Sequence, residues 1–282
     1  MTLRHIAVIG AGTMGSGIAQ TCAAAGHDLL LIDISEQALE RGLQLMQKNL
    51  DRQVNKGTLT CEQAIDTLKR IRTSTHYIDL NGVDMVIEAA TENLALKHSI
   101  LQQIATNVRP DCLIASNTSS LSITELATRI NRPERFMGIH FFNPVPVMGL
   151  VELIRGLQTS NATCSIAQEL VEQLGKTAIH TQNSPGFIVN RILIPMINEA
   201  IFVLQENGDA QAIDASMCLG CNQPIGPLAL ADLIGLDTVL AILESLQTGF
   251  GDPKYRAAPL LREFVAAGFL GKKTGRGFHV YS

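Results

Sequence analysis

The sequence has no excess of basic residues, no long apolar run and no leader pattern ahead of its first strand. Its 22 lysines and arginines are outnumbered by 26 acidic residues, which gives a formal net charge of −4. Because such a chain has no basic field to attract polyanions, we expect no nucleic-acid partner and no binding to anionic membranes. No apolar stretch approaches the ~20 residues of a membrane span. The first strand pattern begins at Ile6, so we expect no signal peptide and a cytoplasmic protein.

The cysteines form no pattern typical of a metal site or a redox centre. Six are scattered through the 282 residues, and only Cys218 and Cys221 form a CxxC pair. No second pair and no nearby histidine complete a zinc site, and the surrounding segment has helical spacing. We therefore predict reduced structural thiols and no metal.

Strand and helix patterns alternate over the first two thirds of the chain. Apolar runs predict strands at 6–9, 29–32, 83–87, 112–115, 136–142, 150–154 and 177–181. Helical spacing predicts helices at 36–56, 61–70, 94–108 and 164–174. This alternation indicates an α/β fold with a doubly wound, mostly parallel sheet of the Rossmann type. Since ligands bind beyond the carboxyl ends of such strands, the loops 10–15, 88–92 and 116–119 are expected to line one crevice.

The pattern changes at residues 184–186, beyond which strand signals nearly vanish. Helices are predicted at 187–204, 210–218, 228–246 and 258–267. The first is apolar almost all round, which is typical of a helix buried centrally or against another subunit, and Pro195 is expected to kink it. We predict a dinucleotide-binding domain at 1–184 and an all-helical substrate and dimerisation domain at 185–282.

A glycine-rich turn follows the first strand and opens a helix, with the residues Gly10, Ala11, Gly12, Thr13, Met14 and Gly15. In a dinucleotide site Gly10 permits the tight turn, Gly12 lets the backbone approach the pyrophosphate, and Gly15 lets the helix pack closely on the sheet. The helix N-terminus then faces the phosphates. The alternative is a glycine turn in an ordinary βαβ unit without a ligand. Under this alternative, the acidic residue at the end of the second strand would be there by chance.

That acid is Asp33, which ends the second strand 18 residues after Gly15. A carboxylate there can accept hydrogen bonds from the adenosine ribose hydroxyls, and it repels a 2′-phosphate. No arginine follows in 34–36 to bind such a phosphate. The sequence therefore predicts NAD, rather than NADP, as the cofactor.

A histidine and a glutamate flank a proline-rich loop in IHFFNPVPVMGLVE. His140 ends an apolar strand, and a hairpin-like return can bring Glu152 back to its ring. A carboxylate on one ring nitrogen raises the basicity of the other, which suits proton abstraction from an alcohol beside NAD. A satisfied core histidine is the alternative.

Seven segments, spread from Ile6 to Tyr281, resemble the L-3-hydroxyacyl-CoA dehydrogenase family, with the single-function bacterial 3-hydroxybutyryl-CoA dehydrogenases as the nearest branch. These segments are GAGTMGSGIAQ, DMVIEAATEN, SNTSSLSI, GIHFFNPVPVMGLVE, SPGFIVNRIL, GPLALADLIGLD and GKKTGRGF. The resemblance implies that His140 is the general base and Glu152 its partner, and that Ser119 and Asn190 hydrogen-bond the substrate oxygens. It also implies NAD contacts by Glu92, Lys97, Ser119, Asn143 and Lys273.

Four of these residues also have a structural alternative. Ser119 could cap a helix near residue 121, and Asn190 could be a satisfied buried amide. Lys97 could be a solvated helix charge and Lys273 an ordinary surface residue. The chain departs from the family at two positions: glycine 149 stands where many relatives carry lysine, and glutamine 223 where histidine is common.

A cationic stripe supports a coenzyme A substrate. Lys48, Arg52 and Lys56 recur at i, i+4 and i+8 on one predicted helix, which suits the CoA phosphates, although such stripes are usually solvated faces. The family resemblance points to Asn49 and Lys56, with Ser119, as CoA-substrate contacts.

The sequence thus predicts an NAD-dependent dehydrogenase of short-chain (S)-3-hydroxyacyl-CoA thioesters that forms a homodimer. Two alternatives remain open. One is a dehydrogenase of a diacid thioester such as 3-hydroxyadipyl-CoA, or of a carrier-protein thioester. The other is an NAD-binding protein without catalysis.

Overall fold

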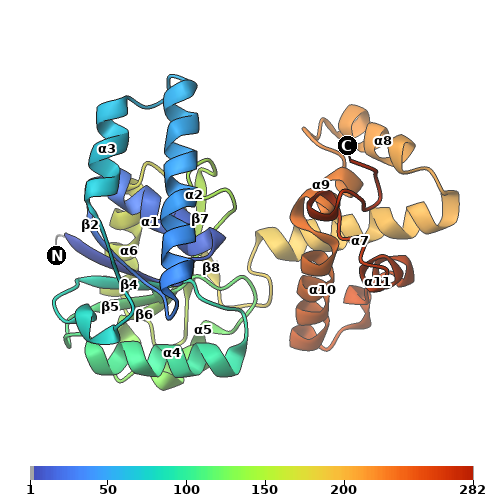
Figure 1. Ribbon diagram of the computed structural model, residues 1–282. Coiled ribbons are helices and arrows are strands. Elements are labelled where there is room, and N and C mark those ends of the chain that lie inside the picture. Colours follow the sequence, from blue (N-terminus) through green and yellow to red (C-terminus); the bar gives the residue numbers. More distant parts are fainter. Residues whose placement is uncertain (1–2, 282) are drawn as a thin grey trace. The chain divides into compact units, whose positions relative to one another are not determined.

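A single sheet dominates the N-terminal part of the computed structural model, which describes residues 3–281. Among these residues, eight strands lie in the order β3-β2-β1-β4-β5-β6-β7-β8 (Figure 1). All neighbouring pairs are parallel except β6 and β7. The strands are β1 His5–Ile9, β2 Asp28–Ile32, β3 Ile71–Ser74, β4 Met85–Glu88, β5 Leu113–Ser116, β6 Phe136–Phe141, β7 Leu150–Arg155 and β8 Thr177–Gln182. The predicted mostly parallel, doubly wound sheet is confirmed.

The strand order reverses between β1 and β4, because β2 and β3 extend the sheet to one side and β5 to the other. Loops that follow strands on either side of such a switch point diverge and leave room for a ligand. The glycine turn follows β1 there, and residues 89–92 follow β4.

Helices cover both faces of the sheet. The face built from alternate strand residues such as Val8 and Leu31 packs on apolar side chains of α1, α2 and α6, including Ile18, Met46 and Leu170. Figure 1 shows α4 on the opposite face. The helices are α1 Thr13–Ala24, α2 Glu36–Asn55, α3 Cys61–Lys69, α4 Leu94–Asn107, α5 Ile123–Leu126 and α6 Asn161–Gln173. Both faces are thus dry, which explains why the central strands are near-continuous apolar runs.

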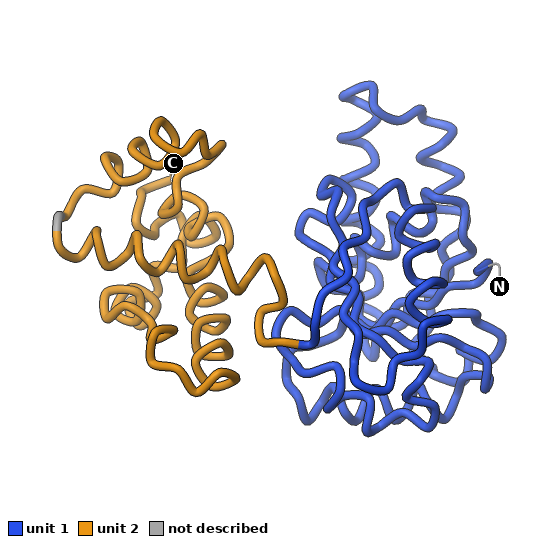
Figure 2. The backbone as a smooth tube through the Cα atoms, turned by 180° about the vertical axis from the view of Figure 1, so that it is seen from behind, with its two compact units in different colours: residues 1–183 blue, residues 184–282 orange. Residues whose placement is uncertain are grey.

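The chain divides into two compact units, residues 1–183 and 184–282 (Figure 2). Helices build the second unit: α7 Val189–Asn207, α8 Ala210–Cys221, α9 Pro227–Ile234, α10 Leu236–Phe250 and α11 Pro259–Ala266. Its core gathers apolar residues of α7, α9, α10 and α11, such as Ile197, Leu228 and Leu243. The all-helical character of this part is confirmed.

One expected element is wrong, and one strand was missed. The single helix predicted over 228–246 is two helices, α9 and α10, separated at Gly235, whose φ of +101° lies outside the helical region. β3 was not predicted, because Ile71-Arg-Thr-Ser74 has one aliphatic residue and lies at the sheet edge. Helix α7 continues through Pro195, and the kink there stays a prediction.

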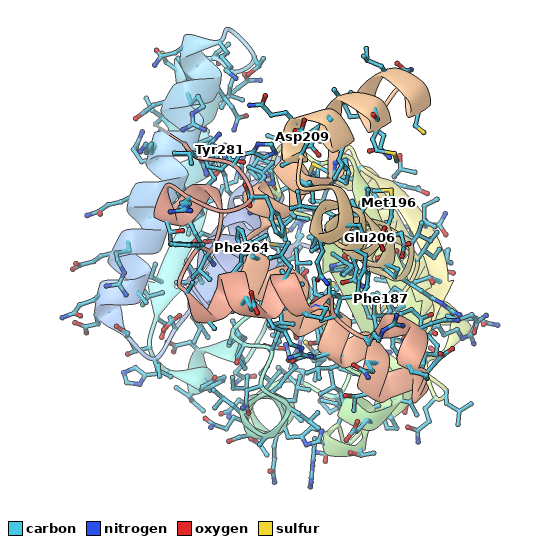
Figure 3. All side chains as sticks on the ribbon, turned by 90° about the vertical axis from the view of Figure 1, so that its right-hand side faces the viewer. Phe187, Met196, Glu206, Asp209, Phe264 and Tyr281 are labelled. Atoms are coloured by element: carbon cyan, nitrogen blue, oxygen red, sulfur yellow. The ribbon has the colours of Figure 1, made fainter. Side chains whose placement is uncertain are left out.

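The C-terminal segment folds back onto the second unit. Asp232 of α9 accepts hydrogen bonds from the backbone N–H groups of Phe278 and His279 and from the hydroxyl of Tyr281. The ring centroid of Phe264 in α11 lies 4.9 Å from that of Phe278. Figure 3 labels Phe264 and Tyr281. No helix among residues 3–281 is both long enough and apolar enough to cross a membrane.

Candidate active site

The glycine turn has the geometry that a dinucleotide requires. Gly10 has φ +101°, and a Cβ added to it would lie 2.7 Å from the Cα of Ala90 in the loop after β4. A Cβ on Gly15 would lie 1.8 Å from the carbonyl oxygen of Gly10. Around Gly12, by contrast, nothing lies within 4 Å of the Cβ position. The turn is therefore closely packed except at Gly12, the point where the backbone is predicted to meet the pyrophosphate.

Asp33 is tied directly to this turn. Its Oδ2 accepts the backbone N–H of Ala11 at 2.8 Å, and its Oδ1 accepts that of Ser35 at 3.1 Å. The carboxylate is thus held at the carboxyl end of β2, beside the turn that would hold the pyrophosphate. Each of its oxygens retains a second lone pair, so the predicted bonds to ribose hydroxyls are compatible with this geometry.

The histidine and glutamate meet across the antiparallel pair β6–β7. His140 and Glu152 are opposite each other in register, so their side chains lie on the same face of the sheet. Nδ1 of His140 lies 2.7 Å from Oε2 of Glu152, and both side chains are buried. The predicted pairing of imidazole and carboxylate is confirmed. The two strands are joined by a loop of eight residues, 142–149.

An aromatic ring lies against the imidazole, and a bond from the loop after β5 holds the strand that carries it. Phe142 lies with its ring centroid 4.4 Å from that of His140, at an interplanar angle of 52°. The side chain of Asn117, in the loop after β5, accepts the backbone N–H of Phe141 at 2.9 Å. The predicted cofactor residue Asn143 follows in the same loop and is exposed.

Glu92 joins the loop after β4 to the loop after β5. Its Oε1 accepts both the backbone N–H of Ser119, at 2.5 Å, and the Ser119 hydroxyl, at 2.7 Å. Its Oε2 accepts the hydroxyl of Thr118 at 2.8 Å. Two residues predicted as cofactor contacts therefore lie together. The capping alternative for Ser119 is wrong, because Ser122 caps α5.

Lys97 is fully buried, so the solvated-charge alternative is wrong. Its Nζ lies 2.6 Å from Oε2 of Glu88 and 3.3 Å from the hydroxyl of Ser116, which itself donates to Glu88 at 2.7 Å. The other oxygen of Glu88 accepts the backbone N–H of Ala90. Lys97 thus acts on the loop after β4 through Glu88. Its direct contact with NAD stays a prediction, and its burial does not support that contact.

The cationic stripe is exposed on α2. Lys48 and Arg52 lie on this helix and Lys56 ends it as the C-cap, while Asn49 is half-buried beside them. The predicted helix is confirmed to within one residue at its C-terminal end. The contacts with CoA stay predictions.

Two predicted site residues belong to the second unit. Asn190 is the second residue of α7. Lys273 lies within the segment GKKTGRG at 271–277, and its Nζ lies 2.6 Å from Oδ1 of Asp237 in the first turn of α10. Burial is the largest single influence on the pKa of Asp237 and raises it, but the bond and charge of Lys273 together with backbone N–H bonds outweigh burial and lower the pKa of that carboxyl. Lys273 is therefore part of an ion pair, not an isolated surface charge.

Some residues of the site were given no individual role by the sequence: Tyr77 was not predicted at all, and Glu88, Ser116 and Asn117 were expected only as parts of crevice-lining loops. Glu88, Ser116 and Asn117 connect the strand ends, and Tyr77 lies near enough that burial and the charges of Glu88 and Asp33 raise its pKa. Glu88 and Ser116 end their strands, and this position was the available signal. Among residues 3–281, no group of three or more acidic, histidine or cysteine side chains could hold a metal ion.

The comparisons with known proteins agree with this geometry. The family described as "3-hydroxyacyl-CoA dehydrogenase, NAD binding domain" matches residues 5–184. The family described as "3-hydroxyacyl-CoA dehydrogenase, C-terminal domain" matches residues 186–281. Together the two matches cover almost the whole chain.

Individual relatives carry the same kind of name. The chain is 50% identical to the "Probable 3-hydroxybutyryl-CoA dehydrogenase" of Bacillus subtilis, over 100% of this chain and 98% of the relative. It is 43% identical to the "3-hydroxyadipyl-CoA dehydrogenase" of Escherichia coli, over 99% of this chain and 59% of the relative. Among solved structures, the (S)-3-hydroxybutyryl-CoA dehydrogenase of Ralstonia eutropha superposes with a TM-score of 0.95 at 57% identity, with both chains fully covered.

Proposed function

The chain belongs to the 3-hydroxyacyl-CoA dehydrogenase family, and we propose that it interconverts (S)-3-hydroxybutyryl-CoA and acetoacetyl-CoA with NAD. The observation that carries the proposal is the buried His140–Glu152 pair at 2.7 Å, beside the loops that follow β4 and β5. The short acyl chain is proposed from the relatives at about 50% identity, whose names specify 3-hydroxybutyryl-CoA.

The pair supplies the base for the oxidation. Glu152 accepts from Nδ1 and so assigns proton transfer to Nε2 of His140. Nε2 removes the proton of the 3-hydroxyl group as hydride leaves C3, and the C3–O bond becomes a carbonyl. In the reduction, the imidazolium returns that proton to the forming alkoxide, and Glu152 stabilises the positive ring. NAD, when bound, supplies the hydride acceptor or donor.

Polar groups hold the reacting carbon in place. Glu92 accepts both the hydroxyl and the backbone N–H of Ser119 in this structure. Because a hydroxyl donates one hydrogen bond, Ser119 is proposed to turn its hydroxyl from Glu92 to the substrate oxygen that carries the developing charge. Asn190 of α7 is proposed to contact the same substrate. The cofactor would be held by the turn at Gly12, where the Cβ position is open, and by Asp33, which accepts the backbone N–H of Ala11 in that turn.

The exposed cations of α2 are proposed to bind the CoA phosphates. Lys48, Arg52 and Lys56 present three positive charges along the last turns of this helix. Each contact to a phosphate is charge-assisted and therefore stronger than a neutral hydrogen bond. Asn49 lies within the same stretch.

Oxidation of NADH, followed at 340 nm with acetoacetyl-CoA, tests the activity directly. We expect His140→Gln to lower kcat by about 10²–10⁴-fold and to leave NADH affinity within about twofold, because general-base catalysis has this magnitude. His180→Gln is the matched control, since His180 is exposed on β8 and bonds only Gln168 among the described contacts. Wild-type turnover by His140→Gln would refute the catalytic assignment.

The same assay separates the alternatives. Faster turnover with 3-ketoadipyl-CoA than with acetoacetyl-CoA would favour the diacid substrate that the E. coli relative's name specifies. Tight NADH binding without turnover of either thioester would favour a non-catalytic NAD-binding protein.

We further propose a homodimer formed through the helical unit and a cytoplasmic location. The support for the dimer is the largely apolar sequence of α7, which leaves the side chain of Ile192 exposed. Sedimentation of a stable monomer at micromolar concentration would contradict it.

A further inference from the structure

A lysine outside the proposed catalytic set holds the loop that connects the two catalytic strands. Lys176 lies between α6 and β8, and its Nζ donates to two backbone carbonyls, Val145 O and Met148 O, each at 2.7 Å. The next residue, Thr177, donates its backbone N–H to Gly149 O, also at 2.7 Å. The loop 142–149 is therefore bound at three carbonyls by the start of β8.

The same loop is seated on the helix that opens the glycine turn. Val145 is 2% exposed and belongs to the main apolar core of the sheet. A Cβ added to Gly17, in the second turn of α1, would lie 2.9 Å from Cβ and 3.0 Å from Cγ2 of Val145. A glycine at position 17 is what lets the loop approach α1 this closely.

These contacts join the catalytic hairpin to the cofactor-binding helix. β6 carries His140 into the loop and β7 carries Glu152 out of it, so a shift of the loop moves the two strand ends. α1 begins at Thr13, and Gly17 follows about one turn later. The contact of Val145 with Gly17 therefore links the loop between the two catalytic strands to the helix that follows the glycine turn.

We infer that Lys176 is a positioning residue of the proposed dehydrogenase: it clamps the loop 142–149 onto α1 at Gly17 and so orients the His140–Glu152 pair toward the nicotinamide. The inference rests on the proposed function. Lys176 is half-buried, and this burial lowers the pKa of its amine; the geometric support is the pair of bonds to the backbone carbonyls of the loop.

Four variants test the inference by steady-state kinetics. Lys176→Met removes both bonds, Lys176→Arg restores a cationic donor, and Gly17→Ala pushes the loop from the other side. Lys69→Met is the control, because Lys69 is exposed on α3. We expect Lys176→Met and Gly17→Ala to lower kcat by about 10–100-fold, since a 1 Å misplacement can cost that much, with KM for NADH changed less than about threefold.

Lys176→Arg should recover at least half of the decrease in log kcat that Lys176→Met causes. The kcat of the double variant Lys176→Met/Gly17→Ala should be no lower than that of the slower single variant. This non-additivity follows if both residues act on one loop. Unchanged kcat with a lowered melting temperature would overturn the inference and leave Lys176 a purely structural residue. Fully additive losses in the double variant would overturn it as well.

A readout independent of turnover separates this inference from the proposed function. The proton between Nδ1 of His140 and Glu152 should give a downfield NMR resonance, which broadens or shifts in Lys176→Met and Gly17→Ala but not in Lys69→Met. If the wild-type protein turns over no 3-ketoacyl-CoA but the resonance still changes in Lys176→Met and Gly17→Ala, the proposed function fails and the positioning role stands. An unperturbed resonance in both variants would overturn the positioning role even in an active enzyme.

Discussion

The buried ion pair of Lys97 and Glu88 offers the sharpest test of how the cofactor loops are held. Both side chains are 0% exposed, and Nζ lies 2.6 Å from Oε2. In Lys97→Met the methionine fills most of the lysine volume but leaves the Glu88 carboxylate buried without its cation. Breaking such a pair typically destabilises a protein by about 3–5 kcal/mol.

Urea unfolding followed by far-UV circular dichroism measures this loss. With an m-value of about 2 kcal/mol/M, the midpoint of the transition that reports the sheet should fall by about 1.5–2.5 M. NADH affinity should also fall, since Glu88 accepts the N–H of Ala90 in the loop that packs on the glycine turn.

Two further variants sharpen the interpretation. Lys69→Met breaks an exposed pair with Asp66 and should change stability by less than about 1 kcal/mol. The double variant Lys97→Met/Glu88→Gln should be more stable than Lys97→Met alone, because a neutral amide can still accept from Ala90. A loss below about 1 kcal/mol in Lys97→Met, or a double variant less stable than the single, would refute the reasoning.

Three other predictions follow from the cofactor turn and the thiols. Gly12→Ala should fold with an unchanged melting temperature but bind NADH at least tenfold more weakly. Gly15→Ala should unfold, because its Cβ would lie 1.8 Å from a carbonyl oxygen. Calorimetry measures the stability of each variant, and NADH fluorescence measures its binding. Asp33→Asn should raise the KM for NADH about tenfold and reduce the preference for NADH over NADPH. An unchanged ratio of kcat/KM for NADH to kcat/KM for NADPH would contradict the predicted role of the carboxylate. At pH 8 a thiol reagent should modify exposed Cys61 but not Cys112, whose pKa is raised to about 12 mainly by burial; early labelling of Cys112 in mass spectra would disprove this.

Much of the fold was predictable because the central strands are buried on both faces. Runs such as Ile6–Ile9 and Leu29–Ile32 are apolar throughout, so their pattern is visible without neighbours. β3 lies at the sheet edge, where one aliphatic residue suffices, and it gave no such signal. The break at Gly235 was hidden because α9 and α10 continue the same apolar spacing on either side of it.

The site divides in the same way. The His140–Glu152 pair was predictable because both residues lie on adjacent strands joined by one short loop. The bond from Ser119 to Glu92 joins residues 27 positions apart, and the bonds from Lys176 to the loop 142–149 span 28 and 31 positions. Residues so far apart in the chain meet only when the whole sheet has formed, and neither pattern nor spacing shows the meeting.

The sequence by itself determined the strand-turn-helix unit with its glycines, the acid at the end of the second strand and the change to helices near residues 184–186. These features depend on local backbone freedom and on the periodicity of burial, which are properties of neighbouring residues. Only the tertiary structure decided that Lys97 is a buried partner of Glu88 and that Lys176 binds the catalytic loop. The reason is physical: whether a lysine is solvated or buried against a carboxylate or a carbonyl depends on what the rest of the chain packs around it.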